Sequence, residues 1–319
     1  MSIFSNSSLF LLGLVLLIAS SDWLIQSSVK LSYLFRLTPL FIGLIVVAFG
    51  TSAPEAGVGI MAAIMDQKDI ALGNIIGSNI SNIGLILGLC AMVVPLKINK
   101  SIFKRELPIM LSAVLLFYLL SLDKVIGRLD GIIFIIFFIV FIIVSYKGSK
   151  DSFDQGELDN FKFRKLFRKA NSKPIIFTLA FVSLIGVMLG AYLMVKSGAR
   201  LAAIFGISPW IIGITVFAIG TSLPELVASL SASLRKVPSI SVGNIVGSNI
   251  FNILFVLGIV ALIRPIRLSS SLLGFEFLAL LFFSVIICIF MRTGYKISRK
   301  EGLVLFLAYL IFLFYIFSR

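Results

Sequence analysis

Two pairs of matching stretches decide the fold of this chain. One pair is GLIVVAFGTSAPE at 43–55 and GITVFAIGTSLPE at 213–225, and the other is GNIIGSNISNIGLILG at 73–88 and GNIVGSNIFNILFVLG at 243–258. A constant offset of 170 residues keeps their glycine, proline and polar positions in register. Because both stretches recur in the same order, the chain is a duplication. We expect the polar residues that the two copies share to form its functional centre.

The composition is that of a polytopic membrane protein. Hydrophobic residues make up 59% of the chain and charged residues 13%, and the mean hydropathy is +1.12, far more apolar than a soluble domain. The net charge of +14 comes from basic residues in short loops between apolar runs, which favours membrane orientation over nucleic-acid binding. Cys90 and Cys288 lie in apolar segments, so we expect buried free thiols. The absence of histidine removes the commonest transition-metal ligand.

Counting apolar runs of about 20 residues predicts ten transmembrane helices. The expected spans are 7–30, 38–64, 70–95, 103–121, 128–146, 174–199, 208–234, 239–264, 271–291 and 300–318. The N-terminal MSIFSNSS lacks the positive region of a cleavable signal peptide, so we expect the first run to stay as a span. With both termini outside, 20 of the 28 lysines and arginines fall on the inner side, as the positive-inside rule requires.

The duplication predicts an all-α membrane protein made of two inverted five-helix repeats with broken helices at mid-membrane. Five spans per copy is an odd number, so the second copy enters from the opposite face. We expect a first repeat at 1–146, with its motif at 43–88, and a second at 174–319, with its motif at 213–258. The polar stretch 147–173 between them has no EF-hand spacing, so it is predicted to be a flexible cytoplasmic linker in a protein of the plasma (inner) membrane. Trp23 and Trp210 are predicted interface anchors.

The GTSAPE motif should break its helix. Pro54 has no N–H to donate to the carbonyl of Gly50, and its ring crowds that carbonyl. Glu55 follows Thr51 at i, i+4 and Ser52 at i, i+3, so a carboxylate, two hydroxyls and released carbonyls converge. The second copy repeats the arrangement with the following residues: Gly220, Thr221, Ser222, Pro224 and Glu225.

A second polar stripe follows in each copy. The first carries Asn74, Ser78 and Asn82, and the second carries Asn244, Ser248 and Asn252, each spaced by four residues and therefore on one helical face. The glycines at 73, 77, 243 and 247 are predicted to let helices approach closely. Taken alone, the stripe is equally compatible with polar packing between membrane helices.

Glu55 and Glu225 favour a functional interpretation. A charge at mid-membrane costs several kcal/mol, about +2.5 to +3.5 on the insertion scale, and neither motif contains a lysine or arginine to offset it. The missing charge must come from something bound. Carboxylate, amide, hydroxyl and carbonyl oxygens make a hard-cation site, and two glutamates balance one calcium or two sodium ions. Without the ion, one of the two carboxylates should take up a proton. Asp22 and Glu276 are expected to be interfacial and not ligands.

The motifs resemble the two alpha repeats of the sodium/calcium exchangers in the calcium:cation antiporter superfamily. The proton-coupled branch carries GN-x-x-E instead, which this chain lacks. The resemblance implies alternating access, with two long tilted helices sliding past an eight-helix core. It implies central cation ligands at Glu55, Glu225, Asn82 and Asn252. Flanking sodium ligands are then implied at Thr51, Thr221, Ser52, Ser222, Ser78, Ser248 and the carbonyls of Ala48 and Ala218. Some members carry Asp where this chain has Asn252, which weakens the case for potassium co-transport.

The leading hypothesis is therefore an antiporter, not an enzyme, that exchanges about three sodium ions for one calcium ion. Calcium and sodium would be its substrates, the lipid bilayer its surroundings, and no cofactor, nucleic acid or obligatory protein partner is expected. A calcium/proton antiporter using the same glutamates is the close alternative. A cation channel is less favoured, because the site is assembled from two inverted copies within one chain. A scaffold role would leave Glu55 and Glu225 unexplained.

Overall fold

The structure is a computed structural model of the chain. It describes residues 3–66, 68–99, 101–151, 161, 163, 164, 167, 172–204, 221–268 and 275–318. Trp210, Ala218 and Gly220, for which the sequence makes predictions, lie outside the described residues.

The described residues form helices, three of which are π-helical turns, joined by four two-residue strands. In chain order the elements are α1 (Ile3–Phe35), α2 (Pro39–Ile42), η1 (Gly43–Val47), α3 (Ala48–Thr51), α4 (Ala53–Ile64), α5 (Lys68–Ser81), η2 (Asn82–Leu87), α6 (Gly88–Val93), β1 (Leu96–Lys97), α7 (Ser101–Lys104), α8 (Glu106–Leu120), β2 (Val125–Ile126), α9 (Arg128–Asp151), α11 (Lys173–Ile204), α14 (Leu223–Leu234), α15 (Pro238–Ile250), η4 (Phe251–Val256), α16 (Leu257–Ile263), β3 (Ile266–Arg267), α17 (Phe277–Arg292), β4 (Lys296–Ile297) and α18 (Arg299–Ser318).

Several helices are long and apolar enough to cross a membrane. Within the described part of the chain five pass this test, namely those at Ile3–Phe35, Ile70–Val93, Arg128–Lys150, Lys173–Gly198 and Pro238–Ile263. The pair Pro39–Thr51 and Ala53–Ile64, bent by 47°, makes a sixth if it counts as one span. Apolar helices therefore account for membrane insertion, and every expected span contains helix.

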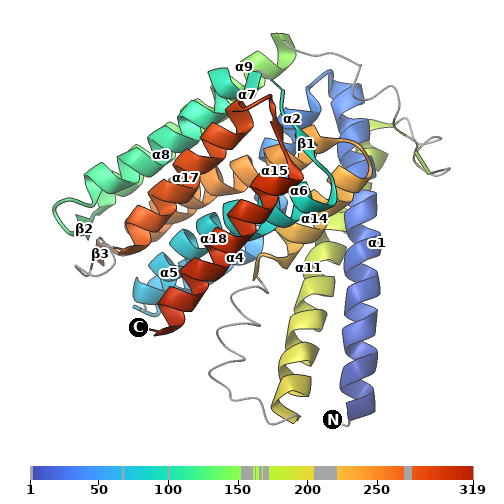
Figure 1. Cartoon of the computed structure of the whole chain (residues 1–319), viewed down its shortest axis with the longest axis horizontal. Coiled ribbons are helices and arrows are strands. Elements are labelled where there is room, and N and C mark those ends of the chain that lie inside the picture. Colours follow the sequence, from blue (N-terminus) through green and yellow to red (C-terminus); the bar gives the residue numbers. More distant parts are fainter. Residues whose placement is uncertain are drawn as a thin grey trace.

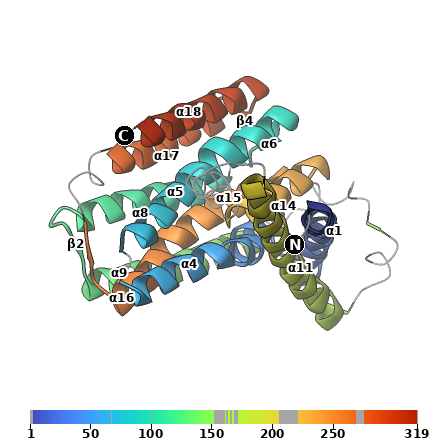
Figure 2. The same cartoon turned by 90° about the horizontal axis from the view of Figure 1, so that it is seen from below.

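Helices α1 and α11 form a long antiparallel pair that stands beside the other helices (Figures 1 and 2). Their 33 and 32 residues exceed the predicted spans of 7–30 and 174–199. The length of an apolar run predicts only the part of a helix that lies in the hydrocarbon of the membrane. The helical hydrogen bonds of the backbone can continue beyond that part. The pair meets backbone to backbone, because a Cβ at Gly13 would lie 2.8 Å from the nitrogen of Met194 and one at Gly190 2.6 Å from that of Leu17.

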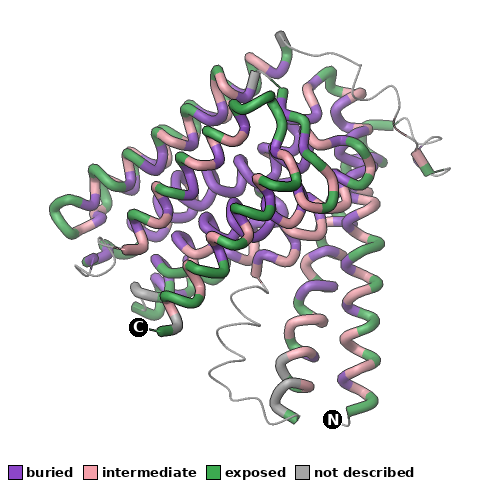
Figure 3. Tube along the Cα trace, in the orientation of Figure 1, coloured by how far each residue is buried: buried purple, intermediate pink, exposed green. Residues whose placement is uncertain are grey.

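The buried core follows the two segments that carry the polar stripes, and it forms the central purple region of Figure 3. The spans at 70–93 and 238–263 are 78% and 83% buried, against 28% for the span in α9. Around them, α9 packs on α16 and α18 packs on α6. Outward-facing residues such as Ile136, Phe282 and Ile311 are exposed, as lipid-facing side chains would be. The polar stripes thus lie in the interior of the bundle.

Close glycine packing is confirmed in the second stripe. A Cβ at Gly243 would lie 2.5 Å from the carbonyl oxygen of Leu40, and one at Gly247 would lie 2.3 Å from that of Leu44. Helix α15 therefore touches the backbone of α2 and η1 directly. The corresponding prediction for the glycines at 73 and 77 finds no support among the described residues, since a Cβ added at either position would have no atom within 4 Å.

Two short antiparallel ribbons join the halves of the chain. Strand β1 pairs with β4, with Leu96 opposite Ile297, and β2 pairs with β3, with Ile126 opposite Ile266. The ribbons lie at opposite ends of α8 and α17, because β1 precedes α8 and β4 follows α17, whereas β2 follows α8 and β3 precedes α17 (Figure 1). Each ribbon therefore links a loop before residue 147 to a loop after residue 173.

Part of the predicted linker is attached to the first helix. The ring of Phe167 meets that of Trp23 edge-on, with centroids 6.0 Å apart. The backbone N–H of Arg164 donates to Oε1 of Gln26 at 2.8 Å. These aromatic and polar contacts place Phe167 and Arg164 against α1, whereas the sequence predicted a linker without such contacts. The preceding helix α9 also runs five residues past its predicted end at 146.

Candidate cation-binding site

Both GTS-x-PE motifs lie at a helix break. Helix α3 ends at Thr51, Ser52 has φ −84° and ψ 6°, and α4 begins at the next residue with Pro54 in its first turn. In the second copy Ser222 has φ −90° and ψ 4°, and α14 begins after it. The predicted break is confirmed, and it lies two residues before the proline because the missing N–H and the ring affect the preceding turn.

The two breaks face each other. The side chains of Glu55 and Glu225 are buried, at 2% and 1% exposure. The hydroxyl of Ser52 donates to Oε1 of Glu225 at 2.8 Å, and the hydroxyl of Ser222 lies 3.5 Å from Oε1 of Glu55. Each carboxylate is therefore met by the serine of the other copy. The contact at Glu225 is a full hydrogen bond, whereas the contact at Glu55 is at the limit of one.

Neither carboxylate has a basic partner among the described residues. The ion pairs found there join Arg105 to Glu106, Arg264 to Asp66, and two arginines to Asp22. Two buried negative groups without a counter-charge are unstable in a low-dielectric interior. Their arrangement is suited to a bound cation.

Two asparagines of the stripes, Asn82 and Asn252, use their amide nitrogens in hydrogen bonds and leave their side-chain oxygens without partners in the described part of the chain. The amide of Asn82 donates to Oδ1 of Asn249 at 3.0 Å, and the amide of Asn252 donates to Oγ of Ser78 at 3.1 Å. Both donations cross between the copies. The oxygen of each amide is left buried and without a hydrogen-bond partner in the described part of the chain.

Four buried oxygens thus lack partners at corresponding positions of the two copies. They are Oε2 of Glu55, Oε2 of Glu225, Oδ1 of Asn82 and Oδ1 of Asn252. Buried polar atoms are normally hydrogen-bonded, to protein, water or an ion. The described residues contain other buried oxygens without partners, including Oδ1 of Asn79, but these four are distinguished by recurring in both copies beside two carboxylates that have no counter-charge. Two carboxylates and two amide carbonyls are hard-cation ligands.

Backbone irregularity accompanies the asparagines. Asn82 opens the π-helical turn η2, and Asn252 is the second residue of η4. Single π-turns inside α-helices are frequently found at functional sites. The sequence analysis did not predict them, because an i→i+5 turn has no residue pattern of its own.

Several other candidate residues lie close to this group. Ser52 lies 2.8 Å from Oγ of Ser248, and Oγ1 of Thr51 lies 3.1 Å from Oδ1 of Asn244. The hydroxyl of Ser52 is thus within hydrogen-bond distance of both Oε1 of Glu225 and Oγ of Ser248. The carbonyl of Ala48 accepts the N–H of Ser52 at 2.9 Å, and Oγ1 of Thr51 lies 3.5 Å from it.

A cavity of about 570 Å³ reaches the site from one side. Thr221 and Ser78, two of the candidate ligands, line it together with Asn74, and Tyr309 of α18 lies on its wall. The cavity therefore borders the polar stripe of the first copy, but Glu55, Glu225, Asn82 and Asn252 do not line it.

Sequence reasoning named Asn74 and Asn244 as part of the stripe but not as site residues. The amide of Asn74 donates to the backbone carbonyl of Glu55 at 2.9 Å, and that of Asn244 donates to the carbonyl of Glu225 at 3.4 Å. These bonds satisfy carbonyls next to the break and fix the backbone that carries each carboxylate. Their matched positions in the duplication were the available signal.

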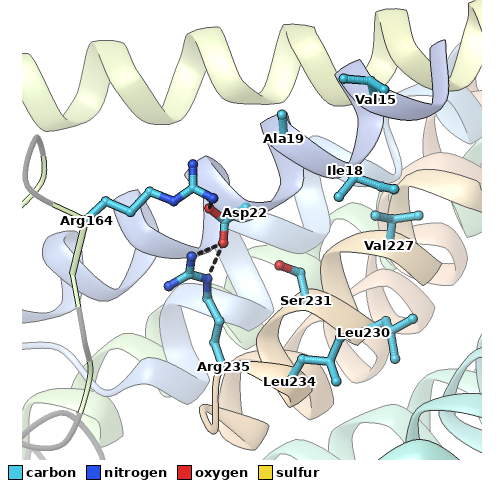
Figure 4. Close-up of a pocket in the computed structure, with 10 residues that line it drawn as sticks. All are labelled: Val15, Ile18, Ala19, Asp22, Arg164, Val227, Leu230, Ser231, Leu234 and Arg235. Carbon is cyan, nitrogen blue, oxygen red and sulfur yellow. Dashed lines mark hydrogen bonds and ion pairs between the residues drawn. The ribbon is translucent and has the colours of Figure 1, made fainter. Parts of the chain in front are cut away.

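Asp22 lies apart from the site, in a different environment. It lines a second cavity of about 590 Å³ between α1 and α14, where its carboxylate pairs with Arg235 and, at 3.1 Å, with Arg164 (Figure 4). Unlike the two glutamates, this carboxylate has counter-charges. In the described part of the chain, Asp22 contacts Gln26 and these two arginines and none of the four free oxygens.

The chain is similar to known cation exchangers over its whole length. The family model for the sodium/calcium exchanger protein matches residues 6–147 and 175–318. The sodium/calcium exchanger MaX1 of Methanosarcina acetivorans is 33% identical over 98% of this chain and 99% of its own length. The inner membrane protein YrbG of Escherichia coli is 34% identical over 94% and 93%.

Solved structures agree with these matches. The sodium-calcium exchanger NCX_Mj soaked with zero Na⁺ and Ca²⁺ superposes with a TM-score of 0.83 at 31% identity, covering 97% of this chain and 98% of that one. The same protein soaked with 2.5 mM Na⁺ and 0.1 mM Ca²⁺ gives 0.82 at 32% identity. The predicted resemblance is confirmed by the family model, the relatives and the solved structures. The chain belongs to the sodium/calcium exchanger family of membrane antiporters.

Proposed function

We propose that this protein exchanges sodium for calcium by alternating access, with calcium held by Glu55, Glu225, Asn82 and Asn252. The observation that carries the proposal is the set of four buried oxygens without partners, one on each of these residues. They supply a charge of −2 and four of the 6–8 oxygens that calcium accepts. The remaining ligands are hydroxyls, carbonyls or water.

Sodium would occupy the flanks of the same group. The proposed ligands are Thr51, Thr221, Ser52, Ser222, Ser78, Ser248 and the carbonyls of Ala48 and Ala218. In support, Ser52 contacts Glu225, Ser222 contacts Glu55, and Ser248 contacts Ser52. Sodium and calcium then compete for shared oxygens, which is what couples the two fluxes.

Energetics favour three sodium ions per calcium ion. Keeping calcium ten-thousandfold lower inside at 100 mV requires about 10 kcal/mol. Each sodium ion entering down a tenfold gradient supplies about 3.7 kcal/mol, so two give about 7.4 and three give about 11. Three suffice under these gradients and two do not, so the exchange would be electrogenic.

The ribbon pairing fits the proposed ten spans in two inverted repeats. The repeats would be 1–146 and 174–319, with the linker 147–173 between them. The loops at 96–97 and 296–297, which pair as β1 and β4, are both predicted to face the cytoplasm. The loops at 125–126 and 266–267, which pair as β2 and β3, are both predicted outside. This agreement supports the ten-span count, because each loop then lies on the same face of the membrane as the loop it pairs with. From the positive-inside count we also propose that both termini lie outside the plasma membrane, and from the family resemblance that α1 and α11 are the mobile helices.

Calcium/proton exchange remains the alternative, since the same two carboxylates would carry protons. The deciding experiment is flux into proteoliposomes loaded with sodium, with voltage clamped by potassium and valinomycin. Sodium-driven uptake of calcium-45 that a protonophore does not change supports the proposal. Uptake that needs a pH gradient and ignores sodium supports the alternative. Calcium efflux that needs no counter-ion, with unitary currents, would indicate a channel.

A further inference from the structure

Asn82 can serve calcium only if its amide faces one way. The oxygen and nitrogen ends of an asparagine amide have nearly the same shape, but only the oxygen binds a cation. What fixes the direction is the acceptor for the Nδ2 protons. For Asn82 this acceptor is Oδ1 of Asn249, at 3.0 Å, and both side chains are about 1% exposed.

Asn249 is in turn held in one direction. Its own Nδ2 donates to the backbone carbonyl of Asn79 at 3.4 Å, which turns its oxygen toward Asn82. The resulting relay runs from a backbone carbonyl of the first copy, through Asn249 of the second, to the amide of Asn82 in the first. At its end Oδ1 of Asn82 is buried and has no partner in the described part of the chain.

The corresponding residue of the other copy does not do this. Asn79, which matches Asn249 in the duplication, turns its amide to the carbonyl of Ile75 in its own helix, at 2.7 Å. Asn252 is instead oriented by Ser78. The chain therefore contains two asparagines in equivalent, equally buried places, of which one orients a candidate ligand.

We infer that Asn249 is a positioning residue that aims the carbonyl oxygen of Asn82 at the calcium ion. The inference rests on the proposed function of Asn82 as a calcium ligand. Without Asn249, the amide of Asn82 loses the acceptor that distinguishes its two ends, and it presents N–H groups to the ion in part of the molecules. Partners that orient metal ligands in this way are typically worth about 10–100-fold in metal affinity.

The test compares Asn249→Ala with Asn79→Ala. We expect Asn249→Ala to raise the KM for calcium, and the Kd measured by calorimetry on purified protein, by about 10–100-fold, with maximal flux within about twofold. Asn79→Ala should change the KM or the Kd for calcium by no more than about threefold, because the backbone carbonyl that accepts from Asn249 remains in this variant. Size-exclusion profiles and melting temperatures control for folding.

A second comparison separates orientation from packing. A carboxylate has two equivalent oxygens and no wrong end, so in an Asn82→Asp background the further change Asn249→Ala should raise the Kd by no more than about threefold. The positioning role would be overturned if Asn249→Ala weakened calcium binding as much in the Asn82→Asp background as in the wild-type background. It would also be overturned if Asn249→Ala and Asn79→Ala weakened calcium binding equally. Wild-type protein that binds no calcium would overturn the proposed function as well, whereas wild-type binding unchanged by Asn249→Ala would overturn the positioning role alone.

Discussion

Neutralising Glu55 or Glu225 is the most direct test of the charge argument. Glutamine keeps the volume and one carbonyl oxygen of each side chain, so the variant removes the charge and little else. At a calcium–oxygen distance of about 2.5 Å, the attraction between the ion and one carboxylate is about 13 kcal/mol at an effective dielectric constant of about 20. If desolvation offsets two thirds of this, about 4 kcal/mol remains. Calcium affinity should then fall about a thousandfold in Glu55→Gln and in Glu225→Gln.

Thermal denaturation gives a readout that does not depend on transport. Calcium should raise the melting temperature of the wild-type protein, because a ligand that binds only the folded state stabilises it. Glu55→Gln should show no such rise at the same calcium concentration. Without calcium the variant should melt no lower than wild type, since one of two facing, unpaired carboxylates has been removed.

Glu106→Gln is the matched control. Glu106 is also about 1% exposed, but its Oε1 lies 3.5 Å from Nε of Arg105, so it has a counter-charge of its own. We expect calcium affinity in this variant to stay within about threefold of wild type. A calcium-induced rise in melting temperature that survives in both Glu55→Gln and Glu225→Gln would refute the reasoning.

Three further predictions concern packing, the α1 contact and pH. Gly247→Ala should lower the melting temperature and cost about 1–3 kcal/mol of stability, because its Cβ would lie 2.3 Å from a backbone oxygen. The control Gly57→Ala should not lower the melting temperature, because a Cβ there would have no atom within 4 Å. Asp22→Asn should destabilise the protein by about 1–3 kcal/mol because it removes the carboxylate that pairs with Arg235, and a double-mutant cycle with Arg235→Gln should show that the two losses are not additive. Acidification should raise the KM for calcium at a fixed sodium gradient, because both site carboxylates must be ionised to hold the ion, and a KM that does not depend on pH would contradict this.

The sequence was sufficient for the parts of the site that depend on residue type. Pro54 predicted the helix break, and the absence of basic residues near Glu55 predicted unpaired charge, because both follow from covalent structure and composition. The direction of an amide does not follow in this way. Asn79 and Asn249 are identical in type and equivalent in position, and only the tertiary contacts distinguish the one that orients a ligand.

The extent of the outer helices and the attachment of the linker were also beyond the sequence. Hydropathy fixes the membrane-embedded length of α1 but not its continuation to Phe35. The contact of Phe167 with Trp23 joins residues 144 positions apart, in a stretch whose polar composition indicated only a linker. Long-range pairing of this kind depends on the packed bundle and not on local propensity.

The two ribbons also restrict which movements can carry an ion across. If the two repeats rotated apart as rigid bodies, the backbone hydrogen bonds between β1 and β4 and between β2 and β3 would have to break in every transport cycle. We therefore expect the two halves joined by the ribbons to move as one rigid body, in which the oxygen ligands of the site keep their relative positions. Calcium would then meet the same set of ligands whichever compartment it comes from, and the direction of transport would depend only on which side is open.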